Sequence, residues 1–175
     1  MNVLLPHGAR AMLSIWERLR GDGPLPQRDA MTADALQVWL GSLSIAELRQ
    51  SLGSWRIYVD FEGSMVTRLV GSSFQGRYLD EAVPADAKDA AELPYLMAMQ
   101  AGDPVFASVG RRGQSERHLR LVMPFADGEP DRVACFLVWF QRSEDAAGLA
   151  LDPVYARGDL EVACHPIPRH LPRAA

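Results

Sequence analysis

Residues 104–141, PVFASVGRRGQSERHLRLVMPFADGEPDRVACFLVWFQ, decide the fold of this chain. They contain three runs with the apolar, β-branched and aromatic content of strands, at 104–110, 118–125 and 133–140. Two polar turns separate the runs, and the second of them reads ADGEP at 126–130. This pattern predicts an antiparallel meander of three strands. Because the last run is apolar throughout, both faces of its strand must be covered.

An amphipathic helix is predicted near the N-terminus, over residues 9–20. Its apolar side chains recur at helical spacing with Arg and Glu between them. These apolar positions are Met12, Ile15, Trp16 and Leu19. Since an isolated helix of about three turns is marginal in water, the apolar stripe must dock on another surface. The chain's own domain and the same helix of a second subunit are the two candidates.

The middle of the chain predicts a hairpin followed by helices. Residues 55–61 alternate as a strand does, and 65–70 form the returning strand after a short turn. From 72 to 102 the period becomes helical, with a break near Glu92 because Pro94 follows. Strands on either side of a helical insert predict an α+β fold with one antiparallel sheet. The insert covers one face, and the N-terminal helix or a partner chain covers the other.

Composition and charge narrow the class of protein. The 175 residues are 48% hydrophobic and 23% charged, with a net charge of -4 and a pI near 5.5. This acidic balance argues against a nucleic-acid or anionic membrane surface. Residues 1–7 lack the basic region of a signal peptide, and no apolar run approaches the roughly 20 residues of a membrane span. We therefore expect a cytoplasmic protein.

Several short pieces of sequence occur in a particular order between residues 16 and 141. They read WERLR at 16–20, WL at 39–40, RLVG at 68–71, GRYLDE at 76–81, PV at 104–105, LRLVMPF at 119–125 and DG at 127–128. In order and spacing these pieces resemble a PAS-like family of short, single-domain proteins found mostly in alphaproteobacteria. The resemblance covers about three quarters of the chain.

The resemblance implies a five-stranded antiparallel sheet with helices on one face, enclosing a space of ligand size. It also implies a sensory or regulatory module that dimerises through its N-terminal helix. We divide the chain into an N-terminal helix and linker (1–27), a PAS-like sensor domain (28–142) and a Pro/Arg/Ala-rich C-terminal tail (143–175). The composition of this tail predicts irregular structure.

The histidines and cysteines suggest no cofactor. His118 alternates with Leu119 and Leu121 along one strand, so it points away from a cavity that the leucines line. Residues 86–101 contain no His to bind haem and no Cys to react with a flavin. No nucleophile stands in a pattern with a base, and no metal-ligand spacing occurs. We therefore predict no haem, flavin, metal or catalytic site, and no enzymatic activity.

Four arginines surround the first turn of the meander: Arg111, Arg112, Arg117 and Arg120. They lack the aromatic stacking partners of a nucleic-acid site. We interpret them as a solvated turn, with an acidic partner surface or an anionic ligand as the alternative.

A ligand of a PAS-like domain would lie between the sheet and the helical insert. The residues expected to line that space are Leu69, Phe74, Tyr78, Tyr95, Met99, Leu119, Leu121, Phe136 and Val138. The alternative is an ordinary filled core at the same spacings. An apolar cavity of roughly 300–1,000 Å³ would indicate a ligand site, whereas a closed core would not.

Two functions follow from these observations. The first is a cytoplasmic sensory module that binds a small, mainly apolar ligand and signals through protein–protein contact, as a homodimer. The second is a constitutive protein-interaction adaptor with a filled core and no ligand. The size of the interior cavity distinguishes them.

Overall fold

The computed structural model describes residues 4–51, 53–113, 117–143, 155 and 160–168. Its strands are β1 (Leu43–Ser51), β2 (Ser54–Glu62), β3 (Val105–Arg111), β4 (Arg117–Ala126), β5 (Val133–Arg142) and β6 (Leu160–Pro166). Its α-helices are α1 (His7–Arg20), α2 (Ala33–Leu36), α3 (Ser64–Val70), α4 (Leu79–Ala82) and α5 (Lys88–Ala101). Short 3-10 helices at Arg28–Ala30, Gln37–Ser42 and Ala85–Ala87 connect some of these elements.

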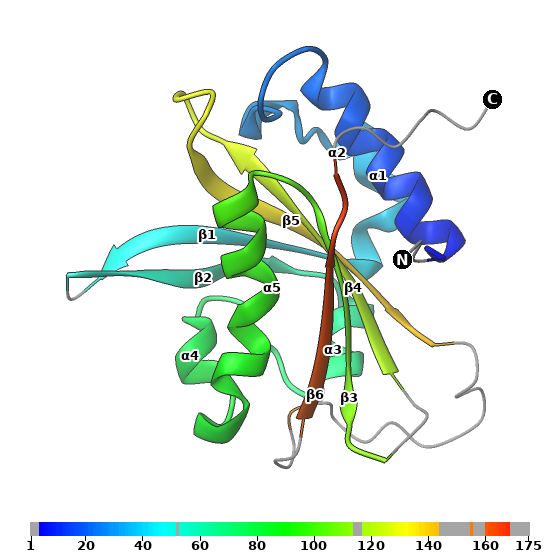
Figure 1. Cartoon of the computed structure of the whole chain (residues 1–175), viewed down its shortest axis with the longest axis vertical. Coiled ribbons are helices and arrows are strands. Elements are labelled where there is room, and N and C mark those ends of the chain that lie inside the picture. Colours follow the sequence, from blue (N-terminus) through cyan, green and yellow to red (C-terminus); the bar gives the residue numbers. More distant parts are fainter. Residues whose placement is uncertain (1–3, 52, 114–116, 144–154, 156–159, 169–175) are drawn as a thin grey trace.

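The strands form one antiparallel sheet in the order β2-β1-β5-β4-β3-β6 (Figure 1). The predicted α+β fold and the three-stranded meander are confirmed. The predicted number of five strands is wrong, because β6 adds a sixth beside β3. This strand lies within the tail that composition predicted to be irregular. Its alternating pattern is short, and Pro166, Pro168 and Pro172 at its end and beyond it favour irregular structure, so the sequence gives little sign of a strand here.

Both faces of the sheet are covered by helices of the same chain. The helical insert between β2 and β3 packs on one face, which we call the insert face, and α1 and α2 pack on the other, which we call the α1 face. Alternate residues of β5 follow this division: Phe136 and Val138 lie on the insert face, and Leu137 and Trp139 on the α1 face. The apolar run of β5 is thus explained by two cores.

The amphipathic helix docks on its own domain. Met12 and Trp16 of α1 are buried in the core of the α1 face, and the half-buried Ile15 and Leu19 pack against the same cluster. The indole Nε1 of Trp16 donates a hydrogen bond to the carbonyl oxygen of Pro124 at 2.8 Å. Homodimerisation through this helix stays a prediction, but the central part of its stripe is already covered.

Two predictions about the middle of the chain are wrong. Residues 65–70 belong to helix α3 rather than to a returning strand, because Val66, Leu69 and Val70 also fit helical spacing and face the core. Gly63 follows β2 directly and is the N-cap residue of α3. In addition, α5 runs continuously through Pro94, with no break near Glu92.

Candidate functional site

The structure separates the residues that were expected to line one cavity. Leu69, Phe74, Tyr95, Phe136 and Val138 belong to the core of the insert face, and Met99 packs at its edge. Leu119 and Leu121 lie on the α1 face, which corrects their assignment to the cavity. The more apolar face of β4 packs against α1 and not against the insert. Strand alternation correctly places Leu119 and Leu121 on one face of the sheet, but the face assigned to them from the sequence was wrong.

The reversal places two basic residues, His118 and Arg120, on the insert face. Both are buried, as is Val122 two residues further along the same strand. His118 therefore faces the insert, contrary to the orientation inferred from the sequence. Burial lowers the pKa of His118 to about 4, and the charges of Arg120, Arg142 and Arg111 act in the same direction. The imidazole is neutral at physiological pH.

Arg120 is the most unusual residue of the interior. Its exposed fraction is only 2%, although a buried guanidinium normally pairs with a carboxylate. One terminal nitrogen, Nη2, donates a hydrogen bond to the hydroxyl of Tyr155, and the guanidinium carbon lies 5.2 Å and 5.5 Å from the ring centroids of Tyr155 and Phe140. Among the described residues, Nε of Arg120 has no hydrogen-bond partner and no salt bridge reaches this side chain.

The space between sheet and insert is nearly filled. The cavity there has a volume of about 10 Å³, close to the smallest space that holds one water molecule. Side chains from the sheet, the insert and residue 155 line it, namely Ser44, Val59, Glu62, Val66, Val70, Phe74, Leu79, Tyr95, Arg120, Phe140 and Tyr155. The interior as described holds no ligand-sized space.

The polar groups of this cavity have partners of different kinds. The carboxylate of Glu62 accepts hydrogen bonds from Thr67 Oγ1 at 2.6 Å and from the backbone N–H of Phe74 at 3.2 Å. Burial raises the pKa values of Tyr95 and Tyr155, so both phenols are protonated at neutral pH. The ring of Tyr95 meets that of Phe136 edge-on at 5.3 Å. The cavity is therefore aromatic, with one buried cation and one carboxylate on its wall.

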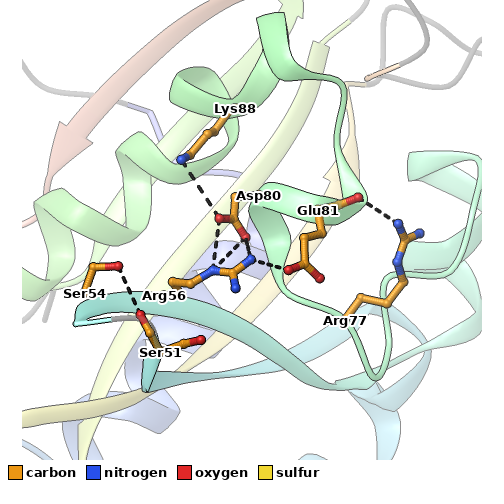
Figure 2. A network of polar contacts seen from close by, with 7 residues as sticks. All are labelled: Ser51, Ser54, Arg56, Arg77, Asp80, Glu81 and Lys88. Atoms are coloured by element: carbon orange, nitrogen blue, oxygen red, sulfur yellow. Dashed lines mark hydrogen bonds and ion pairs between the residues drawn. The ribbon is translucent and has the colours of Figure 1, made fainter.

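Tyr78 does not reach the cavity and belongs to a cluster of charges at the edge of the sheet. Figure 2 shows Arg56 of β2 between the carboxylates of Asp80 and Glu81 of α4. Arg56 Nη2 lies 2.6 Å from both Asp80 Oδ1 and Glu81 Oε1, and its guanidinium carbon lies 4.0 Å from the centroid of the Tyr78 ring.

This charge cluster ties the insert to the exposed side of β2. Lys88 Nζ approaches Asp80 at 4.0 Å, and Arg77 donates to the backbone oxygen of Glu81 at 2.7 Å (Figure 2). The backbone of residues 76–78 also pairs with β2, through hydrogen bonds between Val59 and both Gly76 and Arg77. We interpret the cluster as a structural clamp on an edge strand rather than as a catalytic site.

Replacing Asp80 by Asn should make stability less dependent on pH in the acid range. Arg56 lowers the pKa of Asp80, so the ion pair stabilises the folded state above the unfolded pKa near 4 and loses this effect as pH falls through the folded pKa. We expect Asp80→Asn to melt below the wild type at pH 7. The two melting temperatures should converge below pH 4. The exposed Asp86→Asn is the control, and an equal change in both variants would contradict the clamp.

The larger hollows of the molecule lie on its surface. One open groove has a volume of about 450 Å³, and we call it the outer groove; its lining residues are Leu48, Trp55, Met99, Glu129, Asp131, Arg132 and Val133. Trp55 is 52% exposed, and Arg132 lies over its ring at 5.3 Å. Leu93 and Leu96 on α5 are also exposed. The outer groove thus mixes four apolar with three charged side chains, and a half-exposed tryptophan beside an arginine is a combination common at protein contact sites.

A second open hollow, of about 550 Å³, lies beside the N-terminal end of α1. Trp39, Met65 and Trp139 are among its lining residues. In the described ranges, no group of three or more His, Cys, Asp or Glu side chains could hold a metal ion. No helix in the described part of the chain is long and apolar enough to cross a membrane.

Comparisons with known proteins give little beyond this geometry. No protein-family model matches the chain, and no curated protein matches it. Among solved structures it is similar to the crystal structure of a sensory box sensor histidine kinase from Vibrio cholerae. The TM-score is 0.43 and the identity 11%, over 63% of this chain and 88% of that chain. A likeness of this degree assigns neither a family nor a function.

Proposed function

We propose that the chain is a cytoplasmic, non-enzymatic regulatory module of PAS-like architecture that acts through protein–protein contact. The observation that supports this function best is the interior cavity of only about 10 Å³. A permanently open site for a drug-sized ligand would need roughly 300 Å³ or more. Of the two functions that the sequence left open, the adaptor with a filled core is therefore favoured over a sensor with a permanently bound ligand.

The PAS-like architecture is supported by the sequence pieces and by the order of elements. A hairpin, a helical insert and a three-stranded meander follow one another, and the meander returns β5 to the side of β1. This is the arrangement of a five-stranded antiparallel sheet with helices across one face that the resemblance implies. The strand β6 and the docked helix α1 are additions to it.

The outer groove is the surface that we assign to the partner. It combines a half-exposed tryptophan with an arginine over its ring, further apolar side chains and two carboxylates, and Trp and Arg are residue types enriched in interaction hot spots. The exposed side chain of Trp55 lies on the β1–β2 hairpin, and Met99 approaches from α5. Two parts of the fold thus present one surface.

Photocrosslinking tests this function directly. A benzoylphenylalanine placed at Trp55 should give one discrete adduct with another protein in the host cell, whereas the same group at the exposed Val38 should not. With the purified partner, Trp55→Ala should weaken binding at least about tenfold, and Val38→Ala should leave it unchanged. Adducts at both positions, or at neither, would contradict contact through the outer groove.

Native mass spectrometry of the protein purified from its own host tests the competing function. The adaptor predicts a mass without a small molecule, and the same spectrum reports whether the predicted homodimer exists. A small molecule retained in stoichiometric amount would instead favour a sensor with a permanent ligand.

A further inference from the structure

We propose that the interior contains a binding site for a small neutral phenol, and that the chain's own Tyr155 occupies this site as a displaceable side chain. This inference goes beyond the proposed function, which uses only the outer surface. It rests on the buried Arg120, on the aromatic walls around it and on the origin of Tyr155 outside the sheet and the insert.

Tyr155 occupies the interior much as a bound ligand would. Only 4% of the residue is exposed, and its ring lies 5.8 Å from that of Phe74 at an interplanar angle of 31°. Its hydroxyl oxygen accepts the hydrogen bond from Arg120. The residue lies between β5 and β6 in sequence and belongs to no strand or helix, so its backbone is not part of a ladder of the described sheet.

The environment of Arg120 requires an acceptor oxygen at this place. No other hydrogen bond reaches its guanidinium among the described residues, and a buried charge without an acceptor is costly. If Tyr155 withdraws, the site therefore retains a strong preference for a ligand oxygen at the position of the phenol. The rings of Phe74 and Phe140, on the wall of the cavity, favour an aromatic body on that ligand.

The neighbouring carboxylate decides between a neutral and an anionic ligand. Glu62 lines the same cavity and already supplies a negative charge, with its oxygens held by Thr67 and by the backbone of Phe74. The guanidinium of Arg120 and the carboxylate of Glu62 are of opposite charge, so an aryl carboxylate would leave the closed cavity with a net negative charge, whereas a phenol would not. The site is therefore selective for neutral hydroxyaryl molecules.

The size of the occupant fits this ligand class. With Tyr155 in place the remaining volume is about 10 Å³. Withdrawal of an aromatic side chain leaves a space comparable to the roughly 150 Å³ cavities that accept benzene. Ligand and side chain exclude each other. The apparent affinity of the wild type is therefore the intrinsic affinity multiplied by the fraction of molecules in which Tyr155 is withdrawn.

Calorimetric titration with p-cresol, toluene and benzoate tests the site in Tyr155→Ala. The variant should bind p-cresol about 10- to 100-fold more tightly than toluene, since toluene lacks the oxygen that Arg120 requires. Benzoate should also bind more weakly than p-cresol. Equal affinity for p-cresol and toluene, or tighter binding of benzoate, would overturn the assignment.

Tyr155→Phe provides a second test that keeps the packing of the ring. The Phe side chain cannot accept the hydrogen bond, so it competes less well for the interior, and p-cresol should bind this variant at least about tenfold more tightly than the wild type. Tyr78→Phe is the matched control, because Tyr78 lies outside the cavity and should behave as the wild type.

The proposal can still be tested if one of the two Tyr155 variants fails to fold. If Tyr155→Ala does not fold, the comparison between Tyr155→Phe and the wild type decides, and an unchanged affinity for p-cresol sinks the proposal. Absence of binding to the wild type up to the solubility of p-cresol would likewise show that Tyr155 is a permanent core residue. Neither result would affect the photocrosslinking at Trp55, so the two proposals fail separately.

Discussion

Replacing Trp16 by Glu should strongly reduce the free energy of unfolding. Trp16 is 2% exposed on the α1 face, and its indole N–H is bonded to the carbonyl of Pro124 on β4. The substitution removes the aromatic packing, breaks this hydrogen bond and buries a carboxylate, which together cost at least about 4 kcal/mol. A loss of this size is close to the lower end of the roughly 5–15 kcal/mol by which folded domains are stable. Urea denaturation followed by circular dichroism measures it.

Trp55→Glu is the control for this experiment. Trp55 is half-exposed in the outer groove, so the same change of side chain there should alter the free energy of unfolding by no more than about 1 kcal/mol. Similar losses in the two variants would mean that α1 does not hold the sheet as described. A stable Trp16→Glu protein with a changed oligomeric state would instead place this helix at a dimer interface.

Gly63→Ala should be nearly as damaging although it adds one methyl group. A Cβ atom at this position would lie 2.1 Å from the carbonyl oxygen of Leu40 and 2.5 Å from that of Gly41. These are backbone atoms that cannot rotate away, and the N–H of Gly63 is itself bonded to the carbonyl of Leu43. Overpacking of this severity costs about 3 kcal/mol, and thermal unfolding measures it.

Gly41→Ala is the matched control on the facing segment. A Cβ atom there would meet only the side chain of Met65, at an ordinary distance of 3.7 Å. We expect its melting temperature to stay close to that of the wild type. If Gly63→Ala were equally mild, the close approach of Gly63 to the backbone of Leu40 and Gly41 would be wrong.

The meander and the α+β class could be predicted because their signals are local. Alternation, turn residues and the uniform apolar run of β5 all lie within 104–141, and each depends on neighbours in sequence. The amphipathic stripe of α1 could be predicted for the same reason. Helix α3 could not be predicted, because its residues 65–70 fit the period of a strand as well as that of a helix. The contact of Gly63 with a distant backbone segment leaves no local sign.

The candidate site was less accessible because it depends on which face of β4 turns toward the insert. Sequence alternation pairs Leu119 with Leu121 and His118 with Arg120, but it does not say which pair is inside. Both faces of this sheet are buried, so hydrophobicity alone could not decide. A guanidinium bonded to Tyr155, across a large separation in sequence, has no pattern that would reveal it. The residues on α5 and β5 that were expected to line a cavity belong to the core of the insert face or pack at its edge, where they fill space.

The central position of β5 has a consequence for the order of folding. This strand lies between β1 and β4, and Phe136 pairs with Ala46, a residue about half the length of the chain away in sequence. The β1–β2 hairpin can form early, but its inner edge has no partner until β5 has left the ribosome. Pairing between strands so distant in sequence requires a long loop to form before the contacts between β1 and β5 can stabilise the sheet. The entropy cost of this loop slows folding. During synthesis the exposed edge of β1 is therefore the part of this protein with the greatest need of protection from aggregation.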